Sequence, residues 1–497
     1  MTEPMKLDKD LRSIQEVRDL VGRAREAQRA LAAMSQADLD RITAAISQAG
    51  AQHARRLAQM AVEETGYGRA EDKEIKNRFA ALTLYDAIKE EKTHGILAQD
   101  KEKRTIDIGV PVGVVAGLVP STNPTSTVIY KAMICMKAGN PIIFSPHPSA
   151  IQCISETVKV VSEAARQAGA PEGAVSCIAT PTLEATSALM KHDHTRLILA
   201  TGGAAMVKAA YSSGTPAIGV GAGNGPAYIH HTANVAQAVK RILDSKTFDN
   251  GTICASEQSI VTTRAMEGAV SEELKRQGAY LLSDEEHKKL SKFILRTNGT
   301  MNPAIVGRSV ETVARLAGLD KVPATARVLV ARETGVGPGY PYSSEKLGLI
   351  LAYYVEQDEE AVLRRCVEIL EWEGAGHTFS MHTKDDEMVD YFAKRVPASR
   401  IMVNTPSALG GIGGTTGLMP ALTLGCGAVG GSATSENVGP MQLLNTRKVA
   451  YGLKELEEIR ADLPDCSDGI CRLRTSDVSE ADVEDIVRKI MARLKDL

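Results

Sequence analysis

Cys254 is the residue of this sequence whose type and neighbours best suit covalent chemistry. It lies in SKTFDNGTICASEQSIV, residues 245–261, between the turn-forming letters FDNGT and the β-branched run SIVTT. A loop beside a strand presents a side chain well, and a cysteine thiolate is a strong nucleophile. A buried core thiol is nevertheless the commoner use of cysteine, so these letters alone make Cys254 only a candidate.

Two glycine-containing segments could bring backbone close to a ligand. In TRLILATGGAAMVKAAYSSG an apolar strand runs into Thr201, Gly202 and Gly203 and then into a helix, so free backbone N–H groups could face a phosphate. A tight turn that needs glycine explains the same letters equally well. Residues 404–440 are again rich in glycine, which indicates backbone near a ligand or tight loops, with low-complexity disorder as the alternative.

Composition excludes several classes of protein. The 497 residues allow two or three domains with a large core. Lysine plus arginine (58) nearly balance aspartate plus glutamate (61), so no basic field indicates nucleic acid as a partner. Eight cysteines without paired C-x-x-C spacing predict reduced thiols and no metal site. No secretory leader and no apolar run of about 18 residues are present, so we expect a cytoplasmic protein without a membrane partner.

Short apolar strands that alternate with helices must position the candidate residues. The first hundred residues predict amphipathic covering helices, because apolar residues recur at three-to-four spacing. From about residue 105, strands such as VGVVAGLVP and NPIIFSP alternate with helices, and a second such region covers residues 230 to 425. This pattern predicts βαβ units, mostly parallel sheets and an α/β fold.

The end of the chain differs from the rest. Residues 461–477 are polar, with proline and glycine, and predict a linker. Residues 478–497 predict a short amphipathic helix that needs a groove to bury its apolar stripe, which consists of Val483, Ile486, Val487, Ile490, Met491 and Leu494. Such a helix can dock on its own domain or on another protein.

Several long motifs in order, from about residue 10 to 455, resemble the aldehyde dehydrogenase superfamily. They are GVVAGLVPSTNPTSTVIYKAMICMKAGNPIIFSPHPSA, ILATGG, GVGAGNGPAYI, SKTFDNGTICASEQ and LTLGCGAVGGSATSENVGPMQLLN. More narrowly, they resemble its coenzyme-A-acylating branch, which includes propionaldehyde and acetaldehyde dehydrogenases. The resemblance implies a Rossmann-type dinucleotide-binding domain at 1–228 with an arm strand at about 100–112, a catalytic domain at 229–428, and a return to the cofactor domain and an oligomerisation arm at 429–460. A homo-oligomer, dimer or tetramer, is implied with them.

The resemblance also assigns roles to single residues. Cys254 would attack the aldehyde carbonyl, and the side-chain amide of Asn123 would donate to the oxyanion together with the backbone N–H of Cys254. No acid follows NPIIF to bind a ribose 2′-hydroxyl, so NAD as the cofactor in preference to NADP rests on the resemblance. The residues expected to contact the dinucleotide are Ser121, Thr122, His147, Thr201, Gly202, Gly203, Val220, Gly221 and Glu345, of which His147 and Glu345 could also be ordinary surface residues.

Val220 stands where hydrolytic members of the superfamily carry a catalytic base. Those members have a glutamate, in the pattern Glu-Leu-Gly-Gly, that activates water to release an acid. That pattern, laid without a gap on VGAGNGP, places Val220 at the glutamate position. The implied product is therefore an acyl-CoA, with coenzyme A as co-substrate, unless another part of the chain supplies a base.

Several alternatives stay open on the sequence. Cys426, in LTLGCGAVGG, is a second possible nucleophile. Propionaldehyde is the favoured substrate, with acetaldehyde, sulfoacetaldehyde and succinic semialdehyde as alternatives. The tail resembles peptides that recruit enzymes to bacterial microcompartments, which implies shell proteins as partners and a location inside such a compartment. A catalytically silent scaffold is the non-enzymatic alternative.

Overall fold

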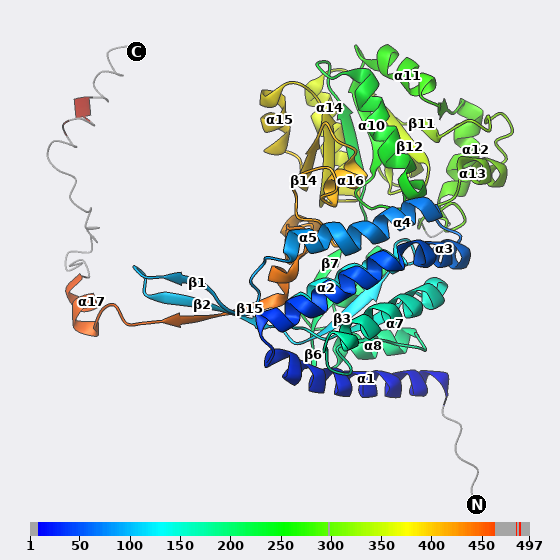
Figure 1. The fold of residues 1–497 in the computed structure, drawn as a ribbon. Coiled ribbons are helices and arrows are strands. Elements are labelled where there is room, and N and C mark those ends of the chain that lie inside the picture. Colours follow the sequence, from blue (N-terminus) through cyan, green and yellow to red (C-terminus); the bar gives the residue numbers. More distant parts are fainter. Residues whose placement is uncertain (1–7, 297–298, 463–483, 485–486, 489–497) are drawn as a thin grey trace, which may run out of the picture. The chain divides into compact units, whose positions relative to one another are not determined.

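The computed structural model describes residues 8–296, 299–462, 484 and 487–488 of the chain (Figure 1). The chain divides into two compact units. The larger comprises Met1–Leu97 and Ile108–Arg447, and the smaller comprises Ala98–Asp107 and Lys448–Leu497. Nearly all of the predicted linker and terminal helix, residues 461–477 and 478–497, lies outside the described residues.

A five-stranded parallel sheet forms the first half of the larger unit. Its order is β5-β4-β3-β6-β7, and all four pairings are parallel. The strands are β3 Val114–Val119, β4 Ile142–Pro146, β5 Val175–Cys177, β6 Thr195–Thr201 and β7 Ala217–Val220, and the helices between them are α6 Pro124–Lys137, α7 Ile151–Gln167, α8 Leu183–Lys191 and α9 Ala204–Tyr211. The predicted alternation of strands and helices is thus confirmed.

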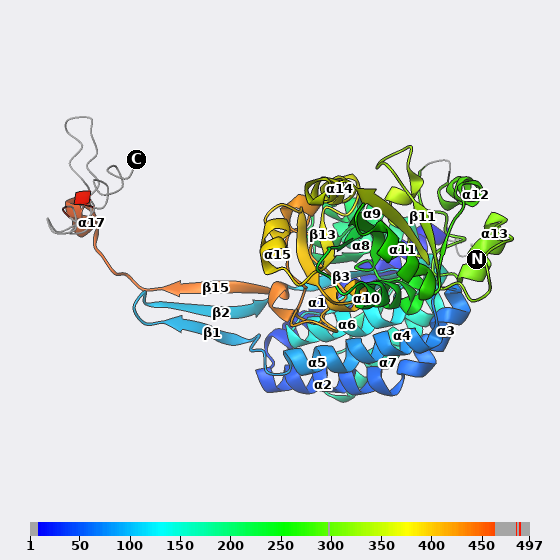
Figure 2. The same ribbon diagram turned by 90° about the horizontal axis from the view of Figure 1, so that it is seen from above.

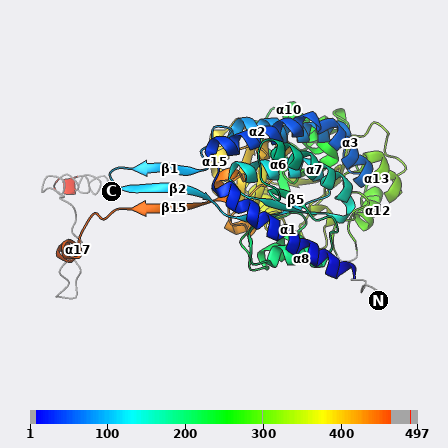
Figure 3. The same cartoon turned by 60° about the horizontal axis from the view of Figure 1, so that its bottom comes forward.

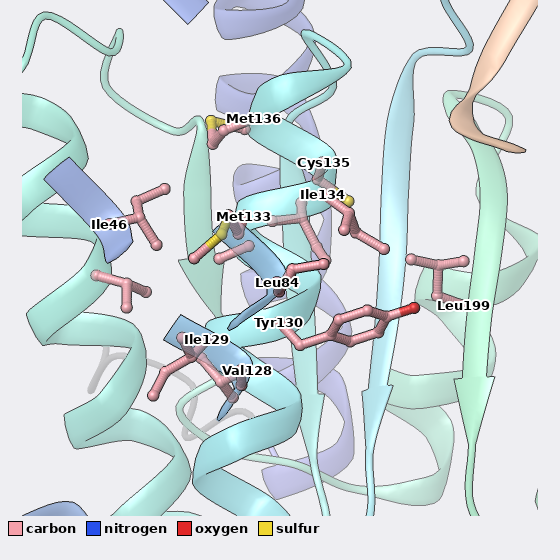
Figure 4. Packing of buried hydrophobic residues seen from close by; sticks show 14 of the residues in the cluster. Ile46, Leu84, Val128, Ile129, Tyr130, Met133, Ile134, Cys135, Met136 and Leu199 are labelled. Carbon is pink, nitrogen blue, oxygen red and sulfur yellow. The ribbon is translucent and has the colours of Figure 1, made fainter. Parts of the chain in front are cut away.

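Helices cover both faces of this sheet, which is why its central strands read as continuous apolar runs. The N-terminal helix α1 Lys9–Ala32 packs with α8 on one face, whereas α2 Gln36–Gln52, α3 Ala54–Thr65, α6 and α7 cover the other (Figure 3). All of α6 is buried. Its Ile129 and Met133 lie on the side of Ile46, and Tyr130 lies toward the strand of Leu199 (Figure 4).

A seven-stranded parallel sheet forms the second half of the larger unit, in the order β10-β11-β12-β9-β8-β13-β14. Its strands are β8 Gly225–Ile229, β9 Glu257–Thr263, β10 Ala279–Leu281, β11 Val328–Arg332, β12 Ile350–Glu356, β13 Gly376–His382 and β14 Ala398–Val403. Two hydrophobic cores, one on each face, hold its helices, which are α10 Val235–Thr247 and α11 Glu267–Arg276 on one face and α12 Asp284–Ile294, α13 Val310–Ala317, α14 Glu359–Trp372 and α15 Asp386–Ala393 on the other.

The boundary expected between residues 228 and 229 falls inside β8. This strand pairs with β9 and β13, so it belongs to the second sheet over its whole length. Its letters, GPAYI, resemble those of the preceding strands, because a buried parallel strand reads the same in either sheet. The sequence pattern therefore locates the strand but not the sheet that it joins.

The glycine-rich residues 404–440 are folded, so the alternative of low-complexity disorder is wrong. They contain the short helix α16 Ser407–Gly411, and Ala408, Leu424 and Val438 are fully buried in the core beneath the five-stranded sheet. A Cβ on Gly425 would lie 2.3 Å from the carbonyl oxygen of Thr434. The glycines thus allow tight loops, and the chain returns through them to its first core.

The segments expected to form an arm are neighbouring strands. The strands β1 Gly95–Asp100, β2 Thr105–Pro111 and β15 Leu444–Ala450 form a sheet in the order β1-β2-β15 (Figure 2). Within the smaller unit, Lys448 Nζ lies 2.6 Å from Asp107 Oδ1, and a helix, α17 Leu456–Asp462, follows. Within the part of the chain that the structure describes, no helix combines the length and apolar character needed to cross a membrane.

Candidate active site

The candidate residues lie where the two sheets of the larger unit approach each other. In the five-stranded sheet, the loops after β3, β6 and β7 carry Asn123, Gly203 and Gly221. In the seven-stranded sheet, Cys254 precedes β9 and Arg400 lies near the start of β14. Because the strands of each sheet are parallel, the first three residues share the carboxyl edge of the five-stranded sheet, where many α/β sheets bind ligands, and Cys254 and Arg400 share the amino edge of the seven-stranded sheet.

Cys254 lies against the loop that follows β7. A Cβ on Gly223 would lie 1.8 Å from the carbonyl oxygen of Cys254, so only glycine allows the two backbones to approach this closely. The backbone N–H of Gly223 in turn donates to Glu345 Oε1 at 2.8 Å. The loop after Val220 therefore connects two of the predicted site residues, Cys254 and Glu345.

Cys254 is held as a thiol by its surroundings. Burial raises its pKa to about 12, and the negative charge of Glu345 acts in the same direction. The Arg400 guanidinium opposes both effects. Burial and the neighbouring Glu373 carboxylate also raise the pKa of Glu345, to about 8. Near neutral pH the Glu345 carboxyl is thus largely protonated and the Cys254 thiolate is a minor species.

Arg400 is a site residue that no sequence motif indicated. It is only 3% exposed, and its guanidinium donates to the carbonyl oxygens of His377 at 3.0 Å and Ser435 at 3.2 Å, while its Nε has no partner. Its own pKa is lowered by burial, and Cys426 and Cys254 are the charges that counteract this. The buried guanidinium of Arg400 therefore acts to lower the pKa of both Cys254 and Cys426.

The two candidate nucleophiles differ in exposure. Cys426 is only 2% exposed, whereas Cys254 is partly exposed. Gly376 and Gly430 pack on Cys426 so closely that a Cβ on Gly376 would lie 1.8 Å from its carbonyl oxygen. Burial raises the pKa of the Cys426 thiol as well. Access by a substrate therefore favours Cys254.

Asn123 faces the segment that carries Cys254. It precedes α6, and its Nδ2 donates to the carbonyl oxygen of Thr252 at 3.0 Å and lies 3.3 Å from Thr122 Oγ1. Its Oδ1 accepts from Lys76 Nζ at 2.6 Å. The amide predicted to bind an oxyanion thus lies beside the Cys254 segment.

Lys76 belongs to a buried charged cluster that sequence patterns did not reveal. Lys73, Lys76 and Asp249 are each at most 2% exposed, and Asp249 Oδ2 lies 2.9 Å from Lys73 Nζ and 2.5 Å from Lys76 Nζ. The lysines come from the helix α4 Ala70–Arg78, and Asp249 from the turn Phe248–Gly251. FDNGT forms the turn that its letters suggested, and Asp249 and Asn250 have left-handed φ values of 48° and 50° in it.

The loops of the five-stranded sheet fit a dinucleotide. Thr201 Oγ1 is buried at the end of β6 without a partner, although most buried hydroxyls have one. A Cβ on Gly203 or Gly221 would meet nothing within 4 Å, and Gly203 has an ordinary φ of −64°. Neither packing nor backbone geometry therefore requires glycine there, and the space in front of these residues is open to a ligand.

Five further residues were predicted to contact the dinucleotide. Ser121 and Thr122 form the half-buried bend between β3 and α6, beside Asn123. Val220 is only 3% exposed and packs into the core. Gly202 lies between Thr201 and Gly203 in the same turn. His147 is exposed after β4, where its Nδ1 accepts from the backbone N–H of Ser149 at 3.1 Å.

A possible metal-binding group was not expected from the sequence. Among the described residues, His230, His231 and Glu359 have ligand atoms within 4.8 Å of one another. One oxygen of Glu359 lies 2.8 Å from His230 Nε2 and 3.0 Å from His231 Nδ1. These atoms therefore already partner one another, and the expected absence of a metal stays a prediction.

Comparison with known proteins identifies the family. The model of the aldehyde dehydrogenase family matches residues 10–292. The chain belongs to the aldehyde dehydrogenase family. The bifunctional aldehyde-alcohol dehydrogenase AdhE of Escherichia coli (strain K12) is 45% identical to it over 443 residues, which are 88% of this chain and 50% of AdhE. The chain thus spans half the length of that curated relative, and the family resemblance noted in the sequence is confirmed.

Solved structures of the family share this fold. A probable aldehyde dehydrogenase from Listeria monocytogenes EGD-e is 60% identical, with a TM-score of 0.90 over 91% of this chain and 100% of that one. An acetylating aldehyde dehydrogenase from Geobacillus thermoglucosidasius is 50% identical, with a TM-score of 0.89 over 91% and 99%. A propionaldehyde dehydrogenase from the Clostridium phytofermentans fucose utilisation bacterial microcompartment is 27% identical, with a TM-score of 0.79 over 88% and 97%. The predicted fold, dinucleotide-binding and catalytic α/β halves, is confirmed.

Proposed function

We propose that this protein oxidises a short aldehyde to its acyl-CoA thioester, with NAD and coenzyme A. The observation that carries this proposal is Val220, an apolar side chain that is only 3% exposed at the end of β7. It cannot activate water, so a thioester on Cys254 would persist until the coenzyme A thiol attacks it. The names of relatives, including the acetylating enzyme from Geobacillus thermoglucosidasius, support this reading.

Each site residue has its own role in the proposed reaction. The Cys254 thiolate adds to the aldehyde carbon, and the resulting oxyanion accepts hydrogen bonds from Asn123 Nδ2 and the Cys254 backbone N–H. The loops of Thr201, Gly203 and Gly221 would hold NAD, which would supply the hydride acceptor. Loss of hydride from the adduct re-forms the carbonyl as a thioester on Cys254. The coenzyme A thiolate then displaces Cys254 and leaves with the acyl group.

Product analysis tests the acylating proposal. With an aldehyde and NAD, we expect about one NADH per Cys254 without coenzyme A, and continuous turnover to acyl-CoA with it. Glu345 is the carboxyl whose charge acts on Cys254, so it is the group to test as a base for water. Efficient release of free acid without coenzyme A, abolished by Glu345→Gln, would establish a hydrolytic enzyme instead.

We propose propionaldehyde as the substrate, with acetaldehyde as the nearest competitor. The microcompartment propionaldehyde dehydrogenase supports the first, whereas the acetylating enzyme with higher identity supports the second. Sulfoacetaldehyde and succinic semialdehyde carry a negative charge, which needs a cation in the substrate pocket. Initial rates over these four aldehydes rank them, and kcat/KM for acetaldehyde above that for propionaldehyde would overturn the assignment.

We further propose that residues 478–497 direct the enzyme into a bacterial microcompartment, and that β1, β2 and β15 join subunits in a homo-oligomer. The amphipathic pattern of the tail supports the first proposal, and the three-stranded sheet supports the second. Residues 462–497 fused to a fluorescent protein should give foci in cells that make shells. Diffuse fluorescence there, or a monomeric mass in solution, contradicts the respective proposal.

A further inference from the structure

Lys76 makes contacts that its ion pair does not explain. Its ammonium group donates to Asp249 Oδ2 at 2.5 Å, to Thr252 Oγ1 at 3.1 Å and to Asn123 Oδ1 at 2.6 Å. An ammonium has three protons and no acceptor, so these bonds use its whole capacity. Asp249 is already paired with Lys73 at 2.9 Å, so its charge does not by itself require a second buried lysine.

The contact with Asn123 determines which way the amide points. A lysine ammonium can only donate, so the atom facing Lys76 must be the carbonyl oxygen of the amide. The NH₂ group is therefore turned toward Thr252 and Thr122, on the side of the Cys254 segment. Both of its protons are engaged there, so the proton in the longer bond, to Thr122 Oγ1 at 3.3 Å, would transfer its bond to the oxyanion. A cation on the carbonyl oxygen also withdraws electron density from the amide, which makes its N–H a stronger donor.

We propose that Lys76 is a positioning residue for the oxyanion site: it orients and polarises the Asn123 amide, while Asp249 and Lys73 hold Lys76 in place. The inference rests on the proposed role of Asn123 in the reaction of Cys254. Lys76 is only 2% exposed, and in this proposal it acts on the oxyanion through Asn123. A role limited to joining α4 to the Phe248–Gly251 turn would not need the bond to Asn123.

Lys73 provides a matched control within the same cluster. Lys73 and Lys76 both pair with Asp249, but Lys73 donates its other bond to the Thr122 carbonyl oxygen at 2.8 Å, whereas the bond to the Asn123 side chain comes from Lys76. Lys73→Met and Lys76→Met therefore remove the same charge from Asp249. We expect similar losses of thermal stability, but a much larger loss of oxyanion chemistry in Lys76→Met.

The experiment measures acylation of Cys254 by p-nitrophenyl acetate, which forms a tetrahedral oxyanion at the same thiol and needs neither NAD nor coenzyme A. Each rate is divided by that of iodoacetamide alkylation at the same pH, which follows thiolate formation without an oxyanion. Removal of one oxyanion donor costs about a hundredfold to a thousandfold. We expect this ratio to fall about tenfold to a hundredfold in Lys76→Met, and less than about threefold in Lys73→Met.

A double-variant cycle separates positioning from structure. In the Asn123→Ala background, Lys76→Met should cost no further acylation, because its effect passes through the missing amide. The same additional loss in both backgrounds, or equal losses for the two lysine variants, would overturn the proposal. Because this assay needs no cofactor, an effect of Lys76 without any acyl-CoA product would refute the proposed function and leave this inference standing.

The pH profile gives a readout that a structural role would not change. Burial lowers the pKa of Lys76 to about 8, with Lys73 acting in the same direction and Asp249 and Asp72 opposing. As pH rises through that value Lys76 loses its charge, so the wild-type ratio of acylation to alkylation should fall. In Lys76→Met the ratio should stay flat. A flat ratio in the wild type contradicts polarisation by Lys76.

Discussion

The charged neighbours of Cys254 should control the reactivity of its thiol. Because its pKa is raised to about 12, the thiolate fraction, and with it alkylation by iodoacetamide, should increase about tenfold per pH unit between about pH 7 and 9. Arg400→Met removes the charge that lowers this pKa and should slow alkylation. Glu345→Gln should accelerate it only above pH 8, since Glu345 is ionised only above its own pKa of about 8.

Mass spectrometry of the labelled peptide measures these rates and distinguishes Cys254 from Cys426. Arg400→Lys is the control, because it keeps the positive charge and should fall between Arg400→Met and the wild type. Equal rates in Arg400→Met and the wild type would show that Arg400 does not act on the thiolate, and faster labelling of Cys426 would reverse the assignment of the nucleophile.

Single residues were predictable from the sequence where a motif surrounds them. Cys254 and Asn123 lie in long motifs, and the structure brings their segments together. Lys76 and Asp249 are separated by 173 positions, and no local pattern links them. Charged residues are usually exposed, so the buried use of Lys76 and Arg400 becomes visible only once the fold is known.

At the scale of elements, the glycines of the turn between β6 and α9 have two explanations, a ligand in front of them or a tight turn, and a substitution at Gly203 distinguishes these. If the open space at Gly203 receives the dinucleotide, Gly203→Ala should raise KM for NAD about tenfold or more, because the new methyl group meets the ligand. Its φ of −64° suits alanine, but Gly203 is the N-cap of α9, where alanine is less favourable than glycine, so the free energy of unfolding should change by less than about 1 kcal/mol. NAD titrations and thermal unfolding measure both quantities.

Gly219→Ala in β7 is the matched control for that turn. A Cβ there would lie 2.7 Å from the Val207 side chain, so this variant should lose stability through steric conflict. If Gly203→Ala lost stability like Gly219→Ala and kept its KM for NAD, the tight-turn explanation would be correct.

The elements themselves were predictable because strands buried on both faces are apolar throughout, whereas the sheet that β8 joins depends on long-range pairing.

At the scale of the whole molecule, the larger unit shares one core between segments far apart in sequence. Tyr130 of α6 donates its hydroxyl to the carbonyl oxygen of Val438 at 2.5 Å, and Asn140 Nδ2 donates to that of Leu443 at 2.8 Å. Both acceptors belong to the segment that follows β14, Ala398–Val403, the last strand of the second sheet along the chain. These buried hydrogen bonds fasten the returning segment to the core of the first half, and the chain itself connects that segment to β14 of the second sheet. This tie between the halves could not be predicted from local sequence patterns.

This tie predicts that the two halves of the larger unit unfold together. Trp372, the single tryptophan of the chain, lies at the end of α14 in the second half, so its fluorescence reports that half. Tyr130→Phe leaves the Val438 carbonyl buried without its partner in the first half, which should cost about 1–3 kcal/mol. We expect the midpoint of urea unfolding of this variant to move to a lower urea concentration, equally when followed by Trp372 fluorescence and by circular dichroism.

Tyr342→Phe is the control in the second half, where it removes a hydroxyl bond to the His287 carbonyl, and it should shift both signals in the same way. If Tyr130→Phe moved the circular dichroism transition but left the Trp372 transition unchanged, the halves would be independent folding units.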